Sequence, residues 1–425
     1  MTRILFSNVT IIDGSGNEPF SGEVLVEGNR ITAVAPSGTT LPRDNSQVID
    51  GRRLVPGDEK PCLMPGLIES HSHLSIDDVD DLAKVGTMPP EENTLLTMHN
   101  ARRYLDFGIT SCISAAAAKP RQDIVIRNAI QAGEIPGPRL LACSPWLTVT
   151  GGLGDMRALH MPHVESMALV VDGPENYRRT TRELIREGVD IIKLVISGDT
   201  FVPHAPSTTT VMSESEVAAA EVVHAHGKRM SAHARSADSV KLCVRHGVKV
   251  IYHANFADEE AFDMLEEHKD ELFVSPNIGF TVVASYEGSE WFSEEQVVQY
   301  GFREELAGAI KGVKELRKRG VRILGGGDYG FSFTPHGNNA RDLDHFAQYF
   351  NFTSLEAILT MTKYGGEAMD LPGELGQIQP GFLADLLLVN GNPAQDTKVL
   401  LDHDKLVAVM KDGHFHKVPA EIYRQ

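Results

Sequence analysis

The feature that most restricts the fold of this 425-residue chain is an alternation of two hydrophobic patterns between about residues 63 and 371. Short apolar runs typical of buried strands are followed by longer amphipathic segments typical of helices. The strand-like runs include Ile109–Ile113, Arg139–Cys143, Val189–Ile196, Arg229–His233, Lys249–His253, Leu272–Pro276 and Val321–Asp328. The helix-like segments include Asn93–Phe107, Glu175–Glu187, Ser213–His226, Ser236–His246 and Glu304–Arg319. This alternation predicts an α/β fold whose parallel sheet closes into a (β/α)8 TIM barrel.

The segments before and after the predicted barrel have a different pattern. Both contain short strand-like pieces separated by turn residues. These pieces are Ile4–Asn8, Gly22–Glu27, Arg30–Ala35, Gly376–Val389 and Lys405–Lys411. We therefore expect residues 1–62 and 372–425 to form one composite β-sandwich domain, with the barrel domain of residues 63–371 inserted between them.

Charge and cysteine content narrow the class of protein. The 58 acidic residues exceed the 40 basic ones, and the formal net charge of -18 argues against a nucleic-acid or acidic-membrane partner. No apolar segment approaches the ~20 residues that span a bilayer, and the N-terminus has no leader-like pattern, so we expect a cytoplasmic protein. The four cysteines are scattered and predict neither a disulfide framework nor a structural zinc cluster.

Two histidines end the first predicted barrel strand. His71 and His73 close the stretch Met64–Leu74. Residues i and i+2 of a strand share a face, so both imidazoles point the same way. Two such imidazoles make half of a site suited to zinc and its neighbours. A lone His-x-His motif is as often a pair of surface histidines.

A lysine interrupts the apolar run of the fourth predicted strand. Burial of an ammonium group is costly and favours the neutral amine of Lys193. A neutral lysine amine can add carbon dioxide and become a carbamate, an anion able to bridge two metal ions. The alternative is a lysine that snorkels to solvent or pairs with a carboxylate.

Three more strand ends finish in residues capable of binding metal. His233 and His253 end the fifth and sixth predicted strands, and each alone is as well explained as a hydrogen-bonded core histidine. Asp328 follows Gly325–Gly327 and could both bind metal and move protons, although an isolated Asp after glycines is more often a turn residue.

The order of these six residues resembles the amidohydrolase superfamily. His-x-His lies on the first barrel strand, Lys on the fourth, His on the fifth and sixth, and Asp on the eighth. Local stretches are similar to the imidazolonepropionase-like branch, which holds metal-dependent prolidases, Xaa-Arg/Lys dipeptidases and ochratoxinase. These stretches are Met64–Leu74, Gly137–Arg139 leading to Thr150–Gly152, Asp190–Gly198, His336–Leu343 and Leu375–Pro393.

The resemblance implies a binuclear metal-dependent hydrolase. By likeness to the family, His71, His73 and Asp328 hold one divalent ion and His233 and His253 the other. Lys193, as N6-carboxylysine, bridges them, and zinc is the expected metal. A hydroxide shared by the ions attacks the substrate, and Asp328 carries its proton to the departing amine. A homo-oligomer is expected.

The substrate-binding residues depart from the family pattern. Members that cleave dipeptides commonly have Gly-Gly-His-Gly-Asp where this chain has Gly151 to Asp155, with Leu153 in place of the histidine. Leucine cannot hydrogen-bond a substrate carboxylate. A second departure is Ser197-Gly198-Asp199, where relatives often have consecutive glycines. Arg235 could replace the missing anion anchor or pair with a nearby carboxylate, and the two interpretations have equal weight.

Aromatic residues near the strand ends could line a pocket mouth. They are Trp146, Tyr252, Tyr329, Phe331, Phe333 and His336, and ordinary loop packing is the favoured interpretation for all except Trp146 and His336. With Leu153, they favour as substrate an amide, carbamate or urea of an N-acylated or aromatic small molecule. The alternatives are an Xaa-Pro or Xaa-Arg/Lys dipeptidase and, less favoured, a mononuclear deaminase that would not need Lys193. A non-enzymatic scaffold is disfavoured because every ligand type is present.

Overall fold

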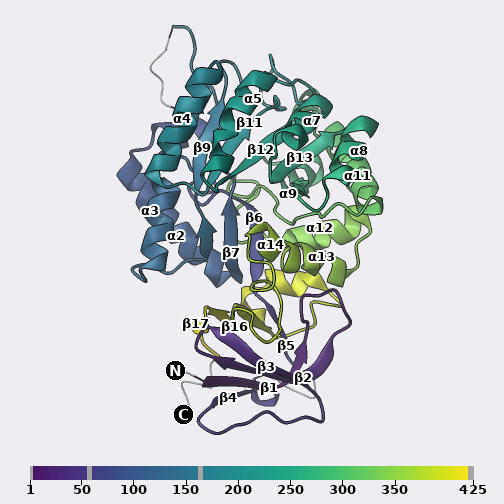
Figure 1. Cartoon of the computed structure of the whole chain (residues 1–425). Helices are drawn as coiled ribbons and strands as arrows, with labels where there is room; N and C mark the ends of the chain where they lie inside the picture. The colour runs from purple at the N-terminus through teal and green to yellow at the C-terminus, as the bar shows by residue number, and fades with distance from the viewer. Residues whose placement is uncertain (1–2, 55–59, 161–165, 420–425) are drawn as a thin grey trace.

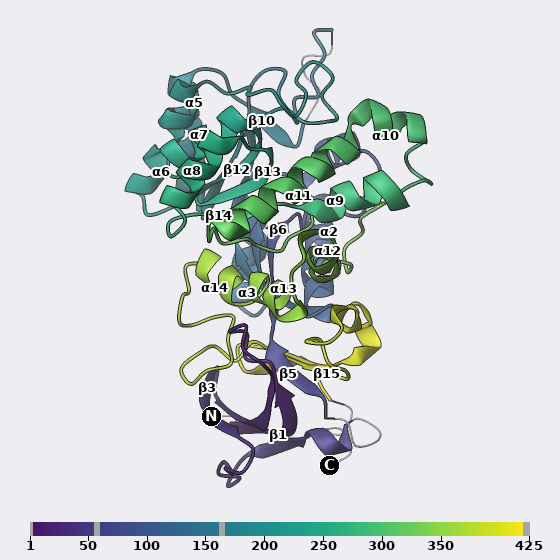
Figure 2. The same ribbon diagram turned by 90° about the vertical axis from the view of Figure 1, so that its right-hand side faces the viewer.

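The computed structural model describes residues 3–54, 60–160 and 166–419. A barrel surrounded by helices lies above a sheet built from both ends of the chain (Figure 1). Figure 2 shows the helices on the outside of the barrel from a second side. No helix among the described residues is long and apolar enough to cross a membrane.

The barrel is built from parallel strands. They are β6 (Leu67–Ser72), β7 (Ile109–Ser114), β8 (Arg139–Leu141), β9 (Cys143–Thr148), β11 (Ile191–Val195), β12 (Arg229–Ser236), β13 (Val250–Phe256) and β14 (Phe273–Ser275), with β10 (Ala168–Val170) added beside β9. The third barrel strand is split at Ala142, so that β8 pairs with β7 and β9 pairs with β11. Seven of the eight barrel positions are therefore occupied by regular strands.

The eighth barrel position differs from the predicted strand Val321–Asp328. The structure has only an isolated bridge there, between Val274 and Ile323. The barrel still closes, because Leu324 N donates to Val274 O at 2.9 Å and Ser70 N donates to Gly325 O at 3.3 Å. The glycines explain the irregularity and the close approach, since a Cβ on Gly326 would lie 2.6 Å from Glu69 Oε1.

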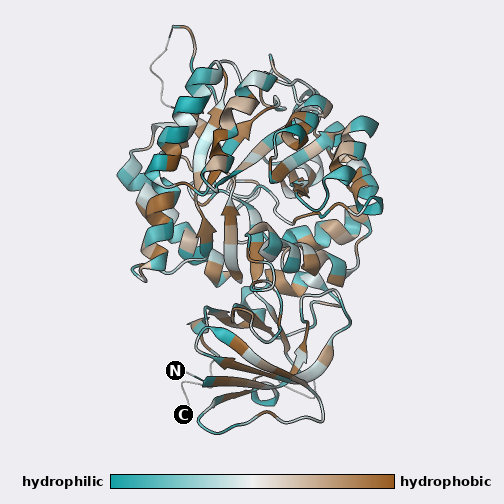
Figure 3. Cartoon of the chain, in the orientation of Figure 1, coloured by the Kyte–Doolittle hydropathy of each residue, from teal (hydrophilic) through white to brown (hydrophobic). Residues whose placement is uncertain are grey.

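Helices cover the barrel. They are α1 (Leu82–Thr87), α2 (Pro90–Asp106), α3 (Gln122–Gln131), α4 (Pro174–Glu187), α5 (Glu214–Ala220), α6 (Val222–Ala225), α7 (Ala237–Arg245), α8 (Glu259–Glu267), α9 (Ile278–Val282), α10 (Glu294–Tyr300), α11 (Phe302–Lys318), α12 (Arg341–Phe350), α13 (Ser354–Thr360) and α14 (Lys363–Ala368). The predicted helix Ser213–His226 is divided at Glu221 into α5 and α6. Figure 3 shows hydrophobic barrel strands inside and hydrophilic faces on the outer helices, as amphipathic helices on a buried sheet require.

The two ends of the chain meet in one eight-stranded sheet. Its strands are β1 (Arg3–Ile11), β2 (Phe20–Glu27), β3 (Arg30–Pro36), β4 (Gln47–Asp50), β5 (Cys62–Pro65), β15 (Leu386–Val389), β16 (Leu406–Lys411) and β17 (His414–Lys417). β5 joins the ends, since it pairs with β1 on one side and β15 on the other. Residues from both ends, such as Phe6, Leu388 and Met410, share one core.

The chain passes from this sheet into the barrel at Gly66, between β5 and β6. A Cβ at this position would lie 2.1 Å from Thr110 Oγ1, so only glycine fits. The division into two domains, a composite domain of residues 1–62 and 372–425 and a barrel domain of residues 63–371, stays a prediction.

Candidate metal centre and active-site cavity

A cavity of about 320 Å³ opens at the carboxyl ends of the barrel strands. All six residues predicted to bind metal line it: His71, His73, Lys193, His233, His253 and Asp328. They come from β6 and the residue that directly follows it, from β11, β12 and β13, and from the irregular eighth segment, which are far apart in sequence. In TIM barrels this end of the sheet carries the active site.

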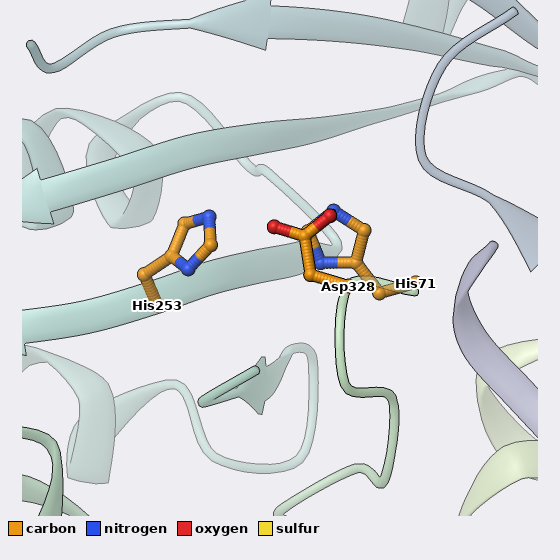
Figure 4. Close-up of side chains that lie close together, drawn as sticks. All are labelled: His71, His253 and Asp328. Carbon is orange, nitrogen blue, oxygen red and sulfur yellow. The ribbon is translucent and has the colours of Figure 1, made fainter. Parts of the chain in front are cut away.

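Asp328 lies at the centre of the group. Its Oδ1 is 3.1 Å from His73 Nε2 and 3.4 Å from His71 Nε2. Donor atoms of His71, His253 and Asp328 all lie within 4.8 Å of one another, and Figure 4 shows one carboxylate oxygen of Asp328 pointing toward His253. This trio contains one histidine from each of the two predicted ion sites.

His233 and His253 form the other side of the group. Their ring centroids are 4.6 Å apart. His233 Nε2 lies 3.0 Å from the carbonyl oxygen of Gly198. A carbonyl can only accept, so Nε2 carries the proton and the lone pair of Nδ1 is available to a metal.

Lys193 is buried between hydrophobic strands and one aromatic ring. Its Nζ lies 3.8 Å from the ring centroid of Tyr252, whose hydroxyl donates to Ser70 O at 2.9 Å. Burial lowers the pKa of Lys193 to about 7. A substantial fraction of the amine is therefore neutral at neutral pH, which is the form that reacts with carbon dioxide.

Two of the six residues have unusual backbones. His253 has φ 78° and Asp328 has φ 62°, both in the left-handed region that non-glycine residues rarely adopt. Ala254, directly after His253, has φ 54°. Strain of this kind persists only where the surrounding structure enforces it, and it concentrates at functional sites. The chain thus turns both side chains into the cavity at an energetic cost.

The protonation states of the candidate metal ligands suit the binding of divalent metal ions. Burial holds the pKa of His71 and of His253 well below the usual range and lowers the pKa of His233 to about 4. Burial alone would raise the pKa of Asp328, but His71, His73 and Lys193 outweigh it and hold the pKa below its usual range. Neutral imidazoles beside an ionised carboxylate are the ligands that zinc and similar ions take.

The residues predicted to bind substrate divide into two groups. Trp146, Leu153 and Arg235 line the cavity. Tyr252, Tyr329 and His336 lie outside its described lining. Tyr252 packs under Lys193, Tyr329 donates to Asp342 Oδ1 at 3.1 Å, and His336 Nε2 donates to Ile76 O at 2.7 Å. These three side chains are buried behind the site. His336 therefore does not lie at the pocket mouth, where it was expected.

One wall of the cavity is made of phenylalanines that the sequence interpretation largely missed. This phenylalanine wall consists of Phe201, Phe280, Phe292, Phe331 and Phe333. Phe280 contacts Phe331 and Phe333 at centroid distances of 5.4 and 5.0 Å, and Phe292 contacts Phe333 at 5.0 Å. Phe331 and Phe333 were expected to be loop packing. The available signal was the density of aromatic residues after the seventh strand.

Arg235 pairs with two carboxylates rather than one. Its Nε lies 3.0 Å from Asp199 Oδ2 and its Nη1 lies 2.6 Å from Glu305 Oε2. The sequence analysis noted Asp199 only because relatives often have a glycine at this position. It missed Glu305, because this residue lies on α11, which carries no motif. The pairing favours the structural interpretation of Arg235.

Comparison with known proteins gives consistent similarities. The model of the Amidohydrolase family matches residues 62–415. Ochratoxinase from Aspergillus niger is 26% identical over 442 residues, covering 96% of this chain and 85% of its own. A prolidase solved with N-methylphosphonate-L-proline superposes with a TM-score of 0.84 at 27% identity, covering 98% of this chain and all of its own. An Xaa-Pro dipeptidase with bound methionine, at 24% identity and a TM-score of 0.83 over 98% of this chain and all of its own, shares the fold.

Proposed function

The chain belongs to the amidohydrolase family and is a hydrolase acting on carbon–nitrogen bonds, and we propose that its substrate is an uncharged or N-acylated aromatic small molecule. The scissile bond would be an amide, a carbamate or a urea. One observation carries the proposal: six side chains able to bind metal or move protons line a single cavity that also has an aromatic wall.

The chemistry divides between bound metal and the protein. His71, His73, His233, His253 and Asp328, together with carboxylated Lys193, would hold two divalent ions, which would supply hydroxide near neutral pH and polarise the substrate carbonyl. Asp328, ionised before the reaction, accepts the proton of the attacking water on its carboxylate and passes it to the departing nitrogen. The Tyr252 ring packs against Lys193, with Nζ 3.8 Å from the ring centroid.

The phenylalanine wall supports an aromatic group on the amine side of the scissile bond. Phe331 and Phe333 follow Asp328 by three and five residues in the same loop and line the same cavity. Because Asp328 delivers its proton to the leaving amine, that amine lies next to this wall. Leu153 and Trp146 line the cavity too and are packed in one apolar cluster, which suits an uncharged acyl group.

A dipeptidase is the second candidate. Its support is the 27% identity to the prolidase over nearly the whole chain. The absence of a histidine at Leu153 and the pairing of Arg235 leave no comparable anchor for a substrate carboxylate in the described lining of the cavity.

Substrate comparison decides between these candidates. We expect kcat/KM on acetanilide to exceed that on Ala-Pro and Ala-Arg by roughly tenfold or more, because burial of a phenyl ring is worth about 2 kcal/mol. The control is N-butylacetamide, which has the same amide without the ring and should be the poorer amide substrate. Hydrolysis rates measured side by side on the metal-loaded enzyme test this. A strong preference for either dipeptide would establish the dipeptidase instead.

Metal counting tests the binuclear centre. We expect elemental analysis of protein dialysed against zinc to give two ions per chain, since the six candidate ligands are too many for one tetrahedral ion. Chelation should remove activity, and zinc should restore it. A single ion per chain in fully active protein would instead support the mononuclear deaminase.

A further inference from the structure

A buried ionic cluster borders the cavity beside the candidate metal centre. It consists of Arg235 and the two carboxylates that contact it, Asp199 and Glu305, and is called here the Arg235 cluster. The exposed fractions of the three side chains are 4%, 6% and 3%. Asp199 and Arg235 line the cavity, whereas Glu305 lies behind Arg235, outside the described lining.

The cluster is held from several elements. Glu305 lies on α11, and its second carboxylate oxygen accepts a hydrogen bond from Ser207. Asn255 Nδ2 donates to the backbone carbonyl of Glu305 at 3.2 Å. Arg235 N donates to Ser197 Oγ at 2.9 Å. The guanidinium is therefore fixed between its carboxylates and cannot swing to a substrate without breaking buried ion pairs.

The charge of the cluster, more than its hydrogen-bonding capacity, decides what it can bind. The guanidinium has a further nitrogen, Nη2, and could in principle donate to a ligand. However, Asp199 and Glu305 already contact Arg235 at 3.0 and 2.6 Å, so their carboxylates offset its positive charge. A substrate carboxylate approaching Arg235 would meet the two carboxylates that already contact the guanidinium, and the attraction between it and Arg235 would be weakened.

Outside the candidate metal centre, the described lining of the cavity has no other cationic side chain that could anchor a substrate carboxylate. Apart from histidines, the cationic side chains in its described lining are Lys193 and Arg235, and Lys193 belongs to the candidate metal centre. Asp80 and Asp81 at the rim add negative charge, although Asp80 pairs with Lys84 at 2.5 Å.

We propose that the Arg235 cluster makes this site select uncharged amides over N-acyl amino acids and dipeptides that carry a free carboxylate. Glu305 acts as a positioning residue, since it holds Arg235 and cancels its charge without lining the cavity. The inference rests on the proposed function and narrows its substrate class.

The test uses two substrates that differ only in one carboxylate, N-phenethylbenzamide and N-benzoylphenylalanine. On the metal-loaded wild-type enzyme we expect kcat/KM to be roughly tenfold or more higher for the uncharged amide. In Glu305→Gln this ratio should fall by roughly tenfold, because one of the two repelling charges is removed. The change should appear in the KM for the acid, since a carboxylate is repelled equally in the ground and transition states.

Two further variants separate selectivity from damage to the fold. Asp199→Asn removes the other carboxylate and should also lower the ratio, so the inference stays testable if Glu305→Gln does not fold. Asp385→Asn is the matched control, because Asp385 and Asp412 flank Arg139 in a similar cluster at 3.2 and 2.7 Å. That cluster lies beside β8 and β15, at the other end of the barrel strands, so this variant should lose stability with the ratio unchanged.

The outcomes distinguish the two proposals. Faster cleavage of N-benzoylphenylalanine by the wild type, or a ratio that stays unchanged in the folded cluster variants, would overturn the selectivity inference while carbon–nitrogen hydrolysis stands. Failure to cleave either compound or any amide of the substrate comparison would overturn the proposed function, and the inference with it.

Discussion

Replacing Asp328 by Asn is expected to lower kcat by roughly a thousandfold or more while the protein remains folded. The asparagine amide has nearly the same shape but cannot accept the proton of the attacking water or return it to the leaving amine. The backbone should tolerate the change, because Asn adopts the left-handed conformation of Asp328, φ 62°, as readily as Asp does. The glycines before it allow the same close approach to β6.

The measurement is single-turnover kinetics on metal-loaded protein, with circular dichroism and metal content recorded on the same sample. Asp370→Asn is the matched control, since Asp370 also has a left-handed backbone, φ 58°, but is exposed and outside the described cavity lining. It should keep full activity. Near-normal turnover in the Asp328 variant would show that another group moves the proton.

Replacing Lys193 by Ala is expected to remove most of the bound metal and, with it, nearly all activity. The carbamate formed on this lysine would be the anion shared by both ions, so its loss leaves a buried gap and an unbalanced positive charge between them. The neutral amine needed for the carbamate is available because burial lowers the pKa of Lys193 to about 7. Added acetate or propionate should restore part of both metal and activity by filling that gap with a carboxylate.

Lys249→Ala is the control for this variant. Lys249 also lies over an aromatic ring, with Nζ 5.6 Å from the centroid of Phe273, but it precedes β13, whereas His253 lies within that strand. It should keep its metal and need no added acid. If Lys193→Ala retained two ions and full turnover without a carboxylic acid, the bridging role assigned to Lys193 would be wrong.

The motif-bearing part of the site could be predicted because each of its residues lies on or directly beside a segment whose local pattern is strong. His71 and His73 share a face through the period-two geometry of a strand, and Lys193 interrupts an apolar run. The sequence analysis did not identify the site residues that lack such a signal. Phe280 lies in a short helix after the seventh strand, and Glu305 contacts Arg235 across 70 residues of sequence.

The path of the chain after the eighth barrel segment was not predictable. His336 was expected at the pocket mouth, whereas ordinary loop packing was the favoured interpretation of Tyr329. Both follow Asp328, whose backbone is left-handed with φ 62°. Tyr329 then turns to Asp342, and His336 turns to the carbonyl of Ile76. Phe331 and Phe333 in the same segment do line the cavity, so the path of the backbone decides which side chains after Asp328 face it, and sequence patterns do not report that path.

The sequence by itself determined the α/β barrel, the terminal sheet and the family, because hydrophobic periodicity and the order of polar strand ends are local properties of the chain. Only the tertiary structure decided the cavity's aromatic wall, the irregular eighth strand and the pairing of Arg235 with Asp199 and Glu305. Those features depend on contacts between distant segments and on how buried charges balance one another, and neither quantity is encoded in any one stretch of residues.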